Sequence, residues 1–269
     1  MNEHVIVALL ATKGLEDFLQ NSLTGLARVG VDPRIVHVAR PDNAAHTLDP
    51  IIREAGAAVH SFVEFGHVSP DAMPERYVDY GTEPFIAINW HKVRYIRWLL
   101  DQYRHVVYAD LDVGWLADPL WYLNAIAKVS PLAFQTEALR RFPPVLCWGF
   151  LSARSSEVTL QLLDTMLRDY EARPAEAPLV DEQNTLDAMI TQDPGLLEHV
   201  HLLSEGLFVN GLGYRNLLDR PAAVTPMLGQ LEPFVFHANW TVGLANKRKL
   251  MAQTGTWLLG APEPDAGGE

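Results

Sequence analysis

Two aspartates separated by one residue form the strongest chemical signal in the chain. Asp110-Leu111-Asp112 directly follows the apolar run 105–109, which predicts a strand. In extended backbone, side chains two positions apart project to the same side, so these carboxylates repel each other unless a cation or hydrogen-bond donors lie between them. Carboxylate oxygens suit magnesium, manganese or calcium, and such an ion can bridge a diphosphate. The alternative is a polar strand end at which one aspartate caps a turn.

Two lysines have the charge needed to contact a phosphate. Lys247 opens the basic run 247–249 and lies one helical turn after Gly243, where backbone can approach a ligand closely. Lys92 lies in a predicted helix that precedes the acidic pair. A lysine ammonium is a compact charge suited to phosphate. Each lysine can equally be a solvated surface charge, so the sequence leaves both interpretations open.

The overall charge argues against a nucleic-acid partner. The chain of 269 residues has 33 acidic and 21 basic residues, a formal net charge of −12, whereas nucleic-acid binding depends on clustered Lys and Arg. No apolar run approaches the ~20 residues that span a bilayer, and the N-terminus lacks the basic region of a signal peptide. Cys147 is the only cysteine, so no intrachain disulfide can form. We therefore expect a cytoplasmic protein without a membrane span.

The elements that must position these residues alternate between strands and helices. The apolar run 5–11 predicts a strand buried on both faces, and Thr12 begins the turn that follows it. A helix with apolar residues at helical spacing over 15–26 and a strand at 34–38 complete a β-turn-α-β opening. Further helices are predicted at 43–55, 85–103, from 118, at 160–167, 182–191 and 246–253, and further strands at 58–60, 132–135, 145–150 and 233–237.

This order predicts an α/β fold with a mostly parallel central sheet flanked by helices. Asp110 and Asp112 then lie at the carboxyl end of a central strand, where open α/β sheets bind ligands. We expect one domain over residues 1–260 and a disordered Pro/Gly/acidic tail at 261–269. The sequence contains no P-loop, no dinucleotide-binding glycine motif, no nucleophile elbow and no paired-cysteine zinc spacing.

The stretch 108–119 resembles the DxD region of GT-A fold glycosyltransferases. More narrowly, it is similar to the nucleotide-diphospho-sugar transferases of glycosyltransferase family 77, which have D-x-D-V-x-W-L followed by D-P. The C-terminal signature H-x-N-W-x-x-G-x-x-x-K of that group is complete at 237–247. Weaker points of similarity are Asn21, Lys92, Gln135, Gly149-Phe150, Arg154-Ser155 and Glu182-Gln183. The resemblance implies a GT-A type, Rossmann-like sandwich.

The resemblance also implies a ligand set for a metal and a nucleotide. Asp110, Asp112 and His237 would hold Mn²⁺ or Mg²⁺, although a lone histidine at a strand end is more often a structural hydrogen-bonding residue. The nucleotide-sugar donor, with UDP as the expected nucleotide, would contact Asp110 and a further set of residues. These are Ala11, Thr12, Lys92, Gly243 and Lys247.

Glu182 and Gln183 are the residues that the resemblance places beside the donor sugar. Related retaining enzymes have an acid-amide pair here, so we expect retention and assign catalytic roles to both residues. Glu182 stands where the group usually has Asp, and Cys147-Trp148 stands where relatives often have an Asn before the Gly. The alternative for Glu182 is an acid stabilised by a helix N-terminus.

Two other classes of protein remain alternatives at this point. One is a different metal-dependent nucleotide-processing enzyme, such as a nucleotidyltransferase or pyrophosphatase, and the other is a non-catalytic nucleotide-binding protein. The sequence does not identify the hydroxyl acceptor or the oligomeric state, but we expect the acceptor pocket near 68–83 and 205–226.

Overall fold

The computed structural model describes residues 2–66, 73–74, 76–137, 141–174, 176–218 and 232–260. The tail at 261–269, and parts of the segments 68–83 and 205–226, lie outside these residues, so the predictions for them are untested there. Among the described residues, no helix combines the length and apolar character needed to cross a bilayer.

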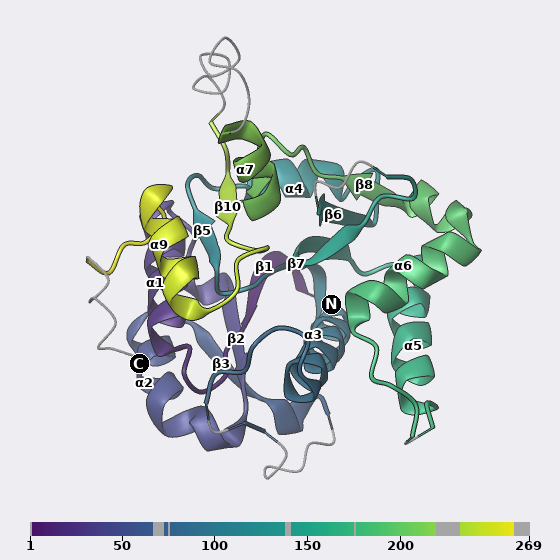
Figure 1. Ribbon diagram of the computed structural model, residues 1–269, viewed down its shortest axis with the longest axis horizontal. Coiled ribbons are helices and arrows are strands. Elements are labelled where there is room, and N and C mark those ends of the chain that lie inside the picture. The colour runs from purple at the N-terminus through teal and green to yellow at the C-terminus, as the bar shows by residue number, and fades with distance from the viewer. Residues whose placement is uncertain are drawn as a thin grey trace.

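A seven-stranded sheet with the order β3-β2-β1-β4-β7-β6-β8 forms the centre of the molecule (Figure 1). Its strands are β1 (Asn2–Leu10), β2 (Val36–Arg40), β3 (Ala58–Ser61), β4 (Tyr103–Ala109), β6 (Leu132–Thr136), β7 (Leu146–Arg154) and β8 (Val200–Leu202). β1 pairs in parallel with both β2 and β4, and only β7 pairs antiparallel with its two neighbours. The mostly parallel sheet predicted from the sequence is confirmed.

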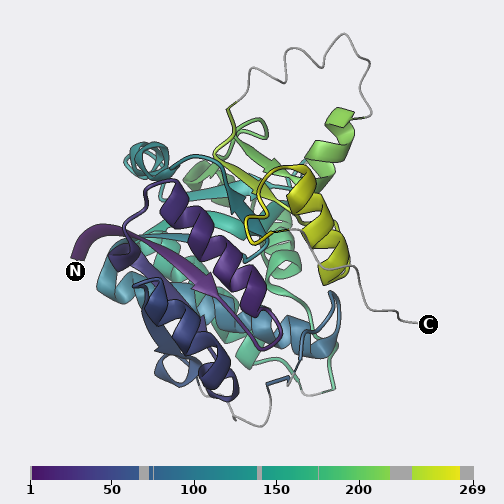
Figure 2. The same ribbon diagram turned by 90° about the vertical axis from the view of Figure 1, so that its left-hand side faces the viewer.

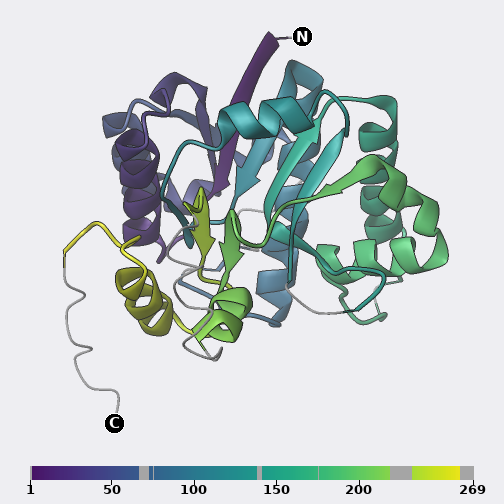
Figure 3. The ribbon, with the colours of Figure 1, turned by 90° about the horizontal axis from the view of Figure 1, so that it is seen from above.

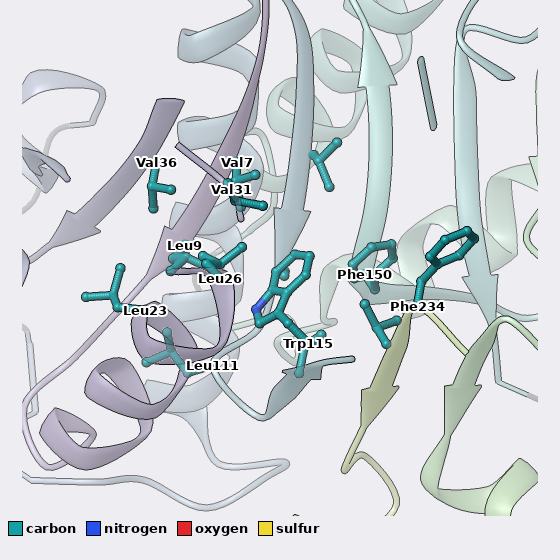
Figure 4. Close-up of a cluster of buried hydrophobic side chains, with 14 of the residues drawn as sticks. Val7, Leu9, Leu23, Leu26, Val31, Val36, Leu111, Trp115, Phe150 and Phe234 are labelled. Atoms are coloured by element: carbon teal, nitrogen blue, oxygen red, sulfur yellow. The ribbon is translucent and has the colours of Figure 1, made fainter. Parts of the chain in front are cut away.

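Successive residues of the central strands contribute their side chains alternately to two separate hydrophobic cores. On β1, Val7 and Leu9 face one core, whereas Ile6 and Ala8 face the other. The first core packs against α1 and α2 and includes Trp115 and Phe234 (Figure 4). Burial on both faces explains why β1 is a continuous apolar run instead of an alternating one.

The helices pack against the two faces of the main sheet and cover the two cores. They are α1 (Glu16–Arg28), α2 (Ala45–Glu54), α3 (Glu83–Gln102), α4 (Leu120–Ile126), α5 (Glu157–Glu171), α6 (Glu182–Gln192), α7 (Gly211–Leu218) and α9 (Leu244–Gln253). α3, α5 and α6 pack together on the second core (Figure 1). α9 lies beside α1, to which Arg248 and Asp17 tie it by a 2.6 Å ion pair (Figure 2).

A second, three-stranded sheet brings the C-terminal part of the chain to the acidic pair. β10 (Val235–His237) pairs antiparallel with β5 (Val113–Trp115) and parallel with β9 (Phe208–Asn210). His237 lies opposite Val113, and the Ala238 amide donates to the Asp112 carbonyl at 3.0 Å. Seen from above, α7 and α9 lie at the same end as β9 and β10 (Figure 3). Residues more than 120 positions apart in the chain therefore meet near the carboxyl end of β4.

Among the strands and α-helices of the described residues, β5, β8, β9 and α7 were not predicted from the sequence. The three strands have three residues each, too few to show an alternating pattern. The predicted N-terminal strand also ends one residue earlier, at Leu10, so Ala11 follows it. Strand β7 is longer than predicted and includes Ala153 and Arg154.

Candidate active site

A cavity of ≈390 Å³ lies at the carboxyl ends of β1 and β4. Eight residues singled out from the sequence line it: Thr12, Lys92, Asp110, Asp112, Glu182, Gln183, His237 and Lys247. Six different elements or the turns after them supply these residues. The fold thus brings together side chains whose proximity the sequence could only suggest.

Asp110, Asp112 and His237 form a cluster with the composition of a metal site. Each offers one ligand atom, and the three atoms lie within 4.8 Å of one another. Ligands opposite each other on a small divalent ion are about 4 Å apart, so only a slight contraction is needed. Two carboxylates and an imidazole suit manganese or magnesium. The donor set therefore fits the divalent ion that the resemblance implies.

The tautomer of His237 favours this interpretation. Its Nδ1 lies 2.8 Å from Oε1 of Gln135, whose own amide nitrogen donates to the Phe208 carbonyl at 3.0 Å. Gln135 is thus oriented to accept, and His237 donates from Nδ1. The free lone pair on Nε2 then lies 3.3 Å from Oδ1 of Asp112. A lone pair and a carboxylate this close repel unless a proton or a cation is shared between them.

Gly149 on β7 makes room for the cluster. Its carbonyl accepts from the Asp110 amide at 2.8 Å. A Cβ at this position would lie 2.3 Å from Cε1 of His237 and 2.7 Å from Oδ2 of Asp110. Glycine is required here for space rather than for conformational freedom.

Lys247 pairs directly with the acidic cluster. Its Nζ lies 2.6 Å from Oδ2 of Asp112, and Asp112 is 6 % exposed. Burial acts to raise the pKa of Asp112, but the charge and the hydrogen bond of Lys247 oppose it, and that pKa is held well below its ordinary value. Burial acts to lower the pKa of Lys247, and Asp112 reverses the shift, so the pKa of Lys247 is raised. Both groups are therefore charged at neutral pH.

Lys92 is a buried charge and not a surface residue. Its Nζ lies 2.8 Å from Oε1 of Glu182 and 3.7 Å from Oδ1 of Asp110, which also accepts from the Tyr108 hydroxyl at 2.9 Å. Burial acts to lower the pKa of Lys92, but Asp110 and Glu182 together raise it above its ordinary value. Lys92 thus links Asp110 of this three-residue cluster to Glu182 on α6.

Glu182 has one oxygen without a partner among the described residues. The residue is 2 % exposed, and Oε2 makes no hydrogen bond there although Oε1 pairs with Lys92. Burial raises the pKa of Glu182. An unsatisfied buried oxygen costs about 1–3 kcal/mol, so its persistence beside a cavity points to a ligand hydroxyl. Gln183 also lines the cavity and accepts weakly from the Trp148 amide at 3.4 Å.

Ala11 and Gly243 do not line the cavity, although the sequence analysis assigned both to nucleotide binding. Ala11 is fully buried, and its amide donates to the Ala39 carbonyl at 2.9 Å. Gly243 precedes α9 with φ of +83°, and its carbonyl accepts from the Lys247 amide. Gly243 therefore turns the chain so that Lys247 reaches Asp112. Thr12, at the end of β1, remains in the cavity lining.

Sequence reasoning missed Glu137, a buried acid in the cavity wall. It follows β6, is 5 % exposed, and accepts from the Asn239 amide at 3.2 Å and from the Trp240 indole N–H. The one available signal was its position two residues after Gln135 at the end of a strand. Its partners lie about one hundred residues away, where no local pattern indicates them.

Comparisons with known proteins agree with this geometry. A family model described as nucleotide-diphospho-sugar transferase matches residues 42–251. The search of curated proteins finds no match. Among solved structures, the galactosyltransferase LgtC in complex with donor and acceptor sugar analogs has a TM-score of 0.56 at 12 % identity, covering 97 % of this chain and 98 % of that one.

Two further structures share the fold over most of their length. Mouse xyloside xylosyltransferase 1 has a TM-score of 0.53 at 11 % identity, covering 89 % of this chain and 98 % of that chain. A glycosyltransferase involved in the glycosylation of the major capsid of PBCV-1 has a TM-score of 0.52 at 10 % identity, with coverage of 92 % and 99 %. At these identities the likeness shows the GT-A fold alone.

The family model spans the acidic pair, α6 and the segment from His237 to Lys247. The narrower resemblance to glycosyltransferase family 77 is not tested by it and stays a prediction. Because the model covers most of the chain, this protein belongs to the nucleotide-diphospho-sugar transferases and is a glycosyltransferase that takes its sugar from a nucleotide-sugar donor.

Proposed function

We propose that the chain transfers a sugar from a UDP-sugar to a hydroxyl acceptor, with retention at the anomeric carbon and with Mn²⁺ or Mg²⁺ held by Asp110, Asp112 and His237. The UDP donor and the retention rest on the resemblance to glycosyltransferase family 77. The metal requirement has an independent basis in the charges of the cavity.

The charge of the cavity lining is the observation that carries the metal requirement. Among the residues that the structure describes, five acids line the cavity, namely Asp110, Asp112, Glu137, Asp181 and Glu182, against two lysines, Lys92 and Lys247. A nucleotide diphosphate is itself an anion and would be repelled by this excess of carboxylates. A divalent ion at the cluster reverses the balance where the diphosphate must lie. When bound, the ion neutralises the diphosphate and stabilises the charge that develops as it leaves.

Different side chains along the cavity would contact the base and the diphosphate of the donor. Thr12, Leu15 and Phe18 line the end nearest β1, where a flat base would contact apolar surface. Lys247 and Lys92 lie on either side of the acidic pair and can hold phosphate oxygens as charge builds on them. Both lysines act as fixed charges, because their carboxylate partners keep them protonated.

Glu182 and Gln183 face the donor sugar in this proposal. The free Oε2 of Glu182 accepts from a sugar hydroxyl, and Gln183 positions the anomeric carbon. Gln183 is an amide and a poor nucleophile, which favours attack by the acceptor from the same face as the leaving group. Such a route requires positioning and charge stabilisation rather than a covalent intermediate.

A screen of donor hydrolysis tests this proposal. The protein is incubated with UDP-, GDP- and dTDP-sugars in the presence of manganese, and the release of nucleoside diphosphate is measured without an acceptor. We expect release from UDP-sugars and an α-configured sugar from an α-linked donor by NMR. Release of pyrophosphate from nucleoside triphosphates with no release from any nucleotide sugar would instead support a nucleotidyltransferase.

A further inference from the structure

Trp240 has a backbone conformation that a large side chain rarely adopts. Among the described residues it is the only one other than glycine with positive φ, at 58°. Such a conformation costs of order 1–3 kcal/mol and persists only where the surroundings impose it. Trp240 nevertheless lines the cavity and is 48 % exposed. The strain therefore holds an indole at the mouth of the site instead of burying it.

Several contacts hold this tryptophan in place. Its indole N–H donates to Glu137, and its carbonyl accepts from Arg215, which also bonds Oγ1 of Thr241 at 2.8 Å. The preceding residue, Asn239, donates to Glu137 at 3.2 Å and accepts from the Gly211 amide at 2.8 Å. The indole edge is thus fixed, and the rest of the ring is free for a ligand.

Other large apolar side chains surround it at the rim. Tyr80 is 69 % exposed and Val242 is 66 % exposed, and both line the same cavity. Tyr80 packs edge-on against Phe85, with ring centroids 5.3 Å apart. Burial raises the pKa of Tyr80, as do the charges of Asp181, Glu137 and Glu182. The rim therefore combines apolar faces with hydrogen-bonding edges.

The order of strands separates this rim from the nucleotide. Thr12 follows β1, the acidic pair follows β4, and Glu137 follows β6. β6 is three strands away from β1 in the sheet, a distance of about 14 Å at the usual strand spacing. Trp240 is bonded to Glu137, so it lies on the side of the Asp110–Asp112–His237 cluster opposite to Thr12, where the proposal places the nucleotide base.

We propose that Trp240 is the stacking platform for the acceptor, that Glu137 is its positioning residue, and that the acceptor is a saccharide. This inference rests on the proposed function. A sugar ring presents an apolar C–H face to the indole and hydroxyls at its edge, which Asn239 and Thr241 can bond. A peptide serine or an unbranched polyol has no such face, so neither needs a flat, fixed aromatic ring.

The test compares acceptor and donor kinetics in a series of variants. Wild type, Trp240→Leu and Trp240→Phe are assayed with manganese and a UDP-sugar against methyl glycosides of glucose, galactose, mannose and xylose, with glycerol and a serine peptide as non-ring acceptors. We expect only the glycosides to accept. We expect Trp240→Leu to raise the acceptor KM about tenfold, as for the loss of roughly 1.4 kcal/mol of stacking, with a smaller rise in Trp240→Phe and a much smaller change in donor KM.

Matched variants separate positioning from general damage. Trp121 on α4 is 65 % exposed and does not line the cavity, so Trp121→Leu should leave both KM values unchanged. Glu137→Gln keeps an oxygen for the indole N–H and should resemble wild type more closely than Glu137→Leu, in which acceptor KM should rise as in Trp240→Leu. Thermal melting checks that each variant is folded.

Three results would overturn the platform: an unchanged acceptor KM in folded Trp240→Leu, a donor KM that rises as much as the acceptor KM, or transfer to the non-ring acceptors alone. Failure of the proposed function looks different, because wild type would then release no nucleoside diphosphate from any donor. In that case saturation-transfer NMR with the same methyl glycosides still tests the platform. Loss of the glycoside signal in Trp240→Leu supports it, and an equal signal contradicts it.

Discussion

The two ends of the cavity are held in opposite ways. At the metal end, Asp112 and His237 are 6 % and 2 % exposed, and each has partners that fix its orientation. At the rim, Tyr80, Trp240 and Val242 expose about half of their surface or more. Buried, preorganised charges suit a reaction in which charge develops on a leaving diphosphate. An exposed apolar rim suits the choice of an acceptor, where shape and surface matter more than charge.

The largest effect is expected from filling the space behind the metal cluster. In Gly149→Ala the new Cβ would collide with the His237 ring and the Asp110 carboxylate, so manganese binding and nucleotide release should fall at least a hundredfold. Calorimetric titration with manganese measures the first, and the donor assay the second. Gly195→Ala is the control, because its added methyl meets only the Asp193 carboxylate at 3.0 Å. Near-normal manganese affinity in Gly149→Ala would contradict the proposal that Asp110 and His237 bind the metal.

A comparable loss of transfer rate, with little loss of donor binding, is expected from changing Gln183. Gln183→Ala should slow transfer by about ten- to a thousandfold, the range for losing one positioned polar contact. Donor binding measured by calorimetry should change much less, because the proposed function places Gln183 beside the anomeric carbon and not beside the diphosphate. An inverted product by NMR would remove the reason for assigning this role to Gln183.

A smaller effect should come from the group that orients His237. Gln135→Leu removes the acceptor for Nδ1–H and frees the ring to turn, so manganese affinity should fall about ten- to a hundredfold. The acceptor KM should stay unchanged, since Trp240 at the rim is held by Glu137 and not by Gln135. A matching loss in acceptor KM would mean that the two ends are not independent.

The smallest effect on catalysis should come from a pair outside the cavity. Nδ1 of His37 lies 2.9 Å from Nε2 of His60, and burial lowers the pKa of His37 from 6.5 to about 4. The unfolded chain therefore binds the extra proton first as pH falls. The stability present above pH 6.5 should decline toward pH 4 by about 3 kcal/mol.

Urea unfolding of wild type and His37→Gln between pH 7.5 and 4.5 measures this contribution. The curve for the variant should be flatter, and nucleotide release at pH 7.5 should be unchanged. Equal pH dependence in the two proteins would contradict the assignment to His37.

The metal end was predictable from sequence to a degree that the rim was not. Asp110 and Asp112 are adjacent to a long apolar strand, so local pattern alone placed them at a strand end. His237 needed the resemblance, because the pairing of β10 with β5 joins residues far apart in the chain. The surface-charge alternative for Lys92 was wrong, since burial of a helical lysine depends on the carboxylates that meet it in the fold.

The rim depended on contacts with no local signature. Glu137 is one of 33 acids, and only its bonds to Asn239 and Trp240 distinguish it. The positive φ of Trp240 is likewise imposed by Arg215 and Glu137, since nothing in the neighbouring sequence favours it. Ala11 and Gly243 do not line the cavity, because the sequence places a residue along the chain but not the direction in which it faces, and their nucleotide-binding roles stay predictions.

The role of Asp112 tests the central claim most directly. Nucleotide release from a UDP-sugar is measured for wild type, Asp112→Asn and Asp118→Asn as manganese is added to EDTA-treated protein. Asp118 accepts a 2.8 Å hydrogen bond from the Leu120 amide at the start of α4 and does not line the cavity, so it is the matched control. We predict manganese-dependent release in wild type and Asp118→Asn and none in a folded Asp112→Asn. Near-normal release by Asp112→Asn in metal-free buffer would contradict the account.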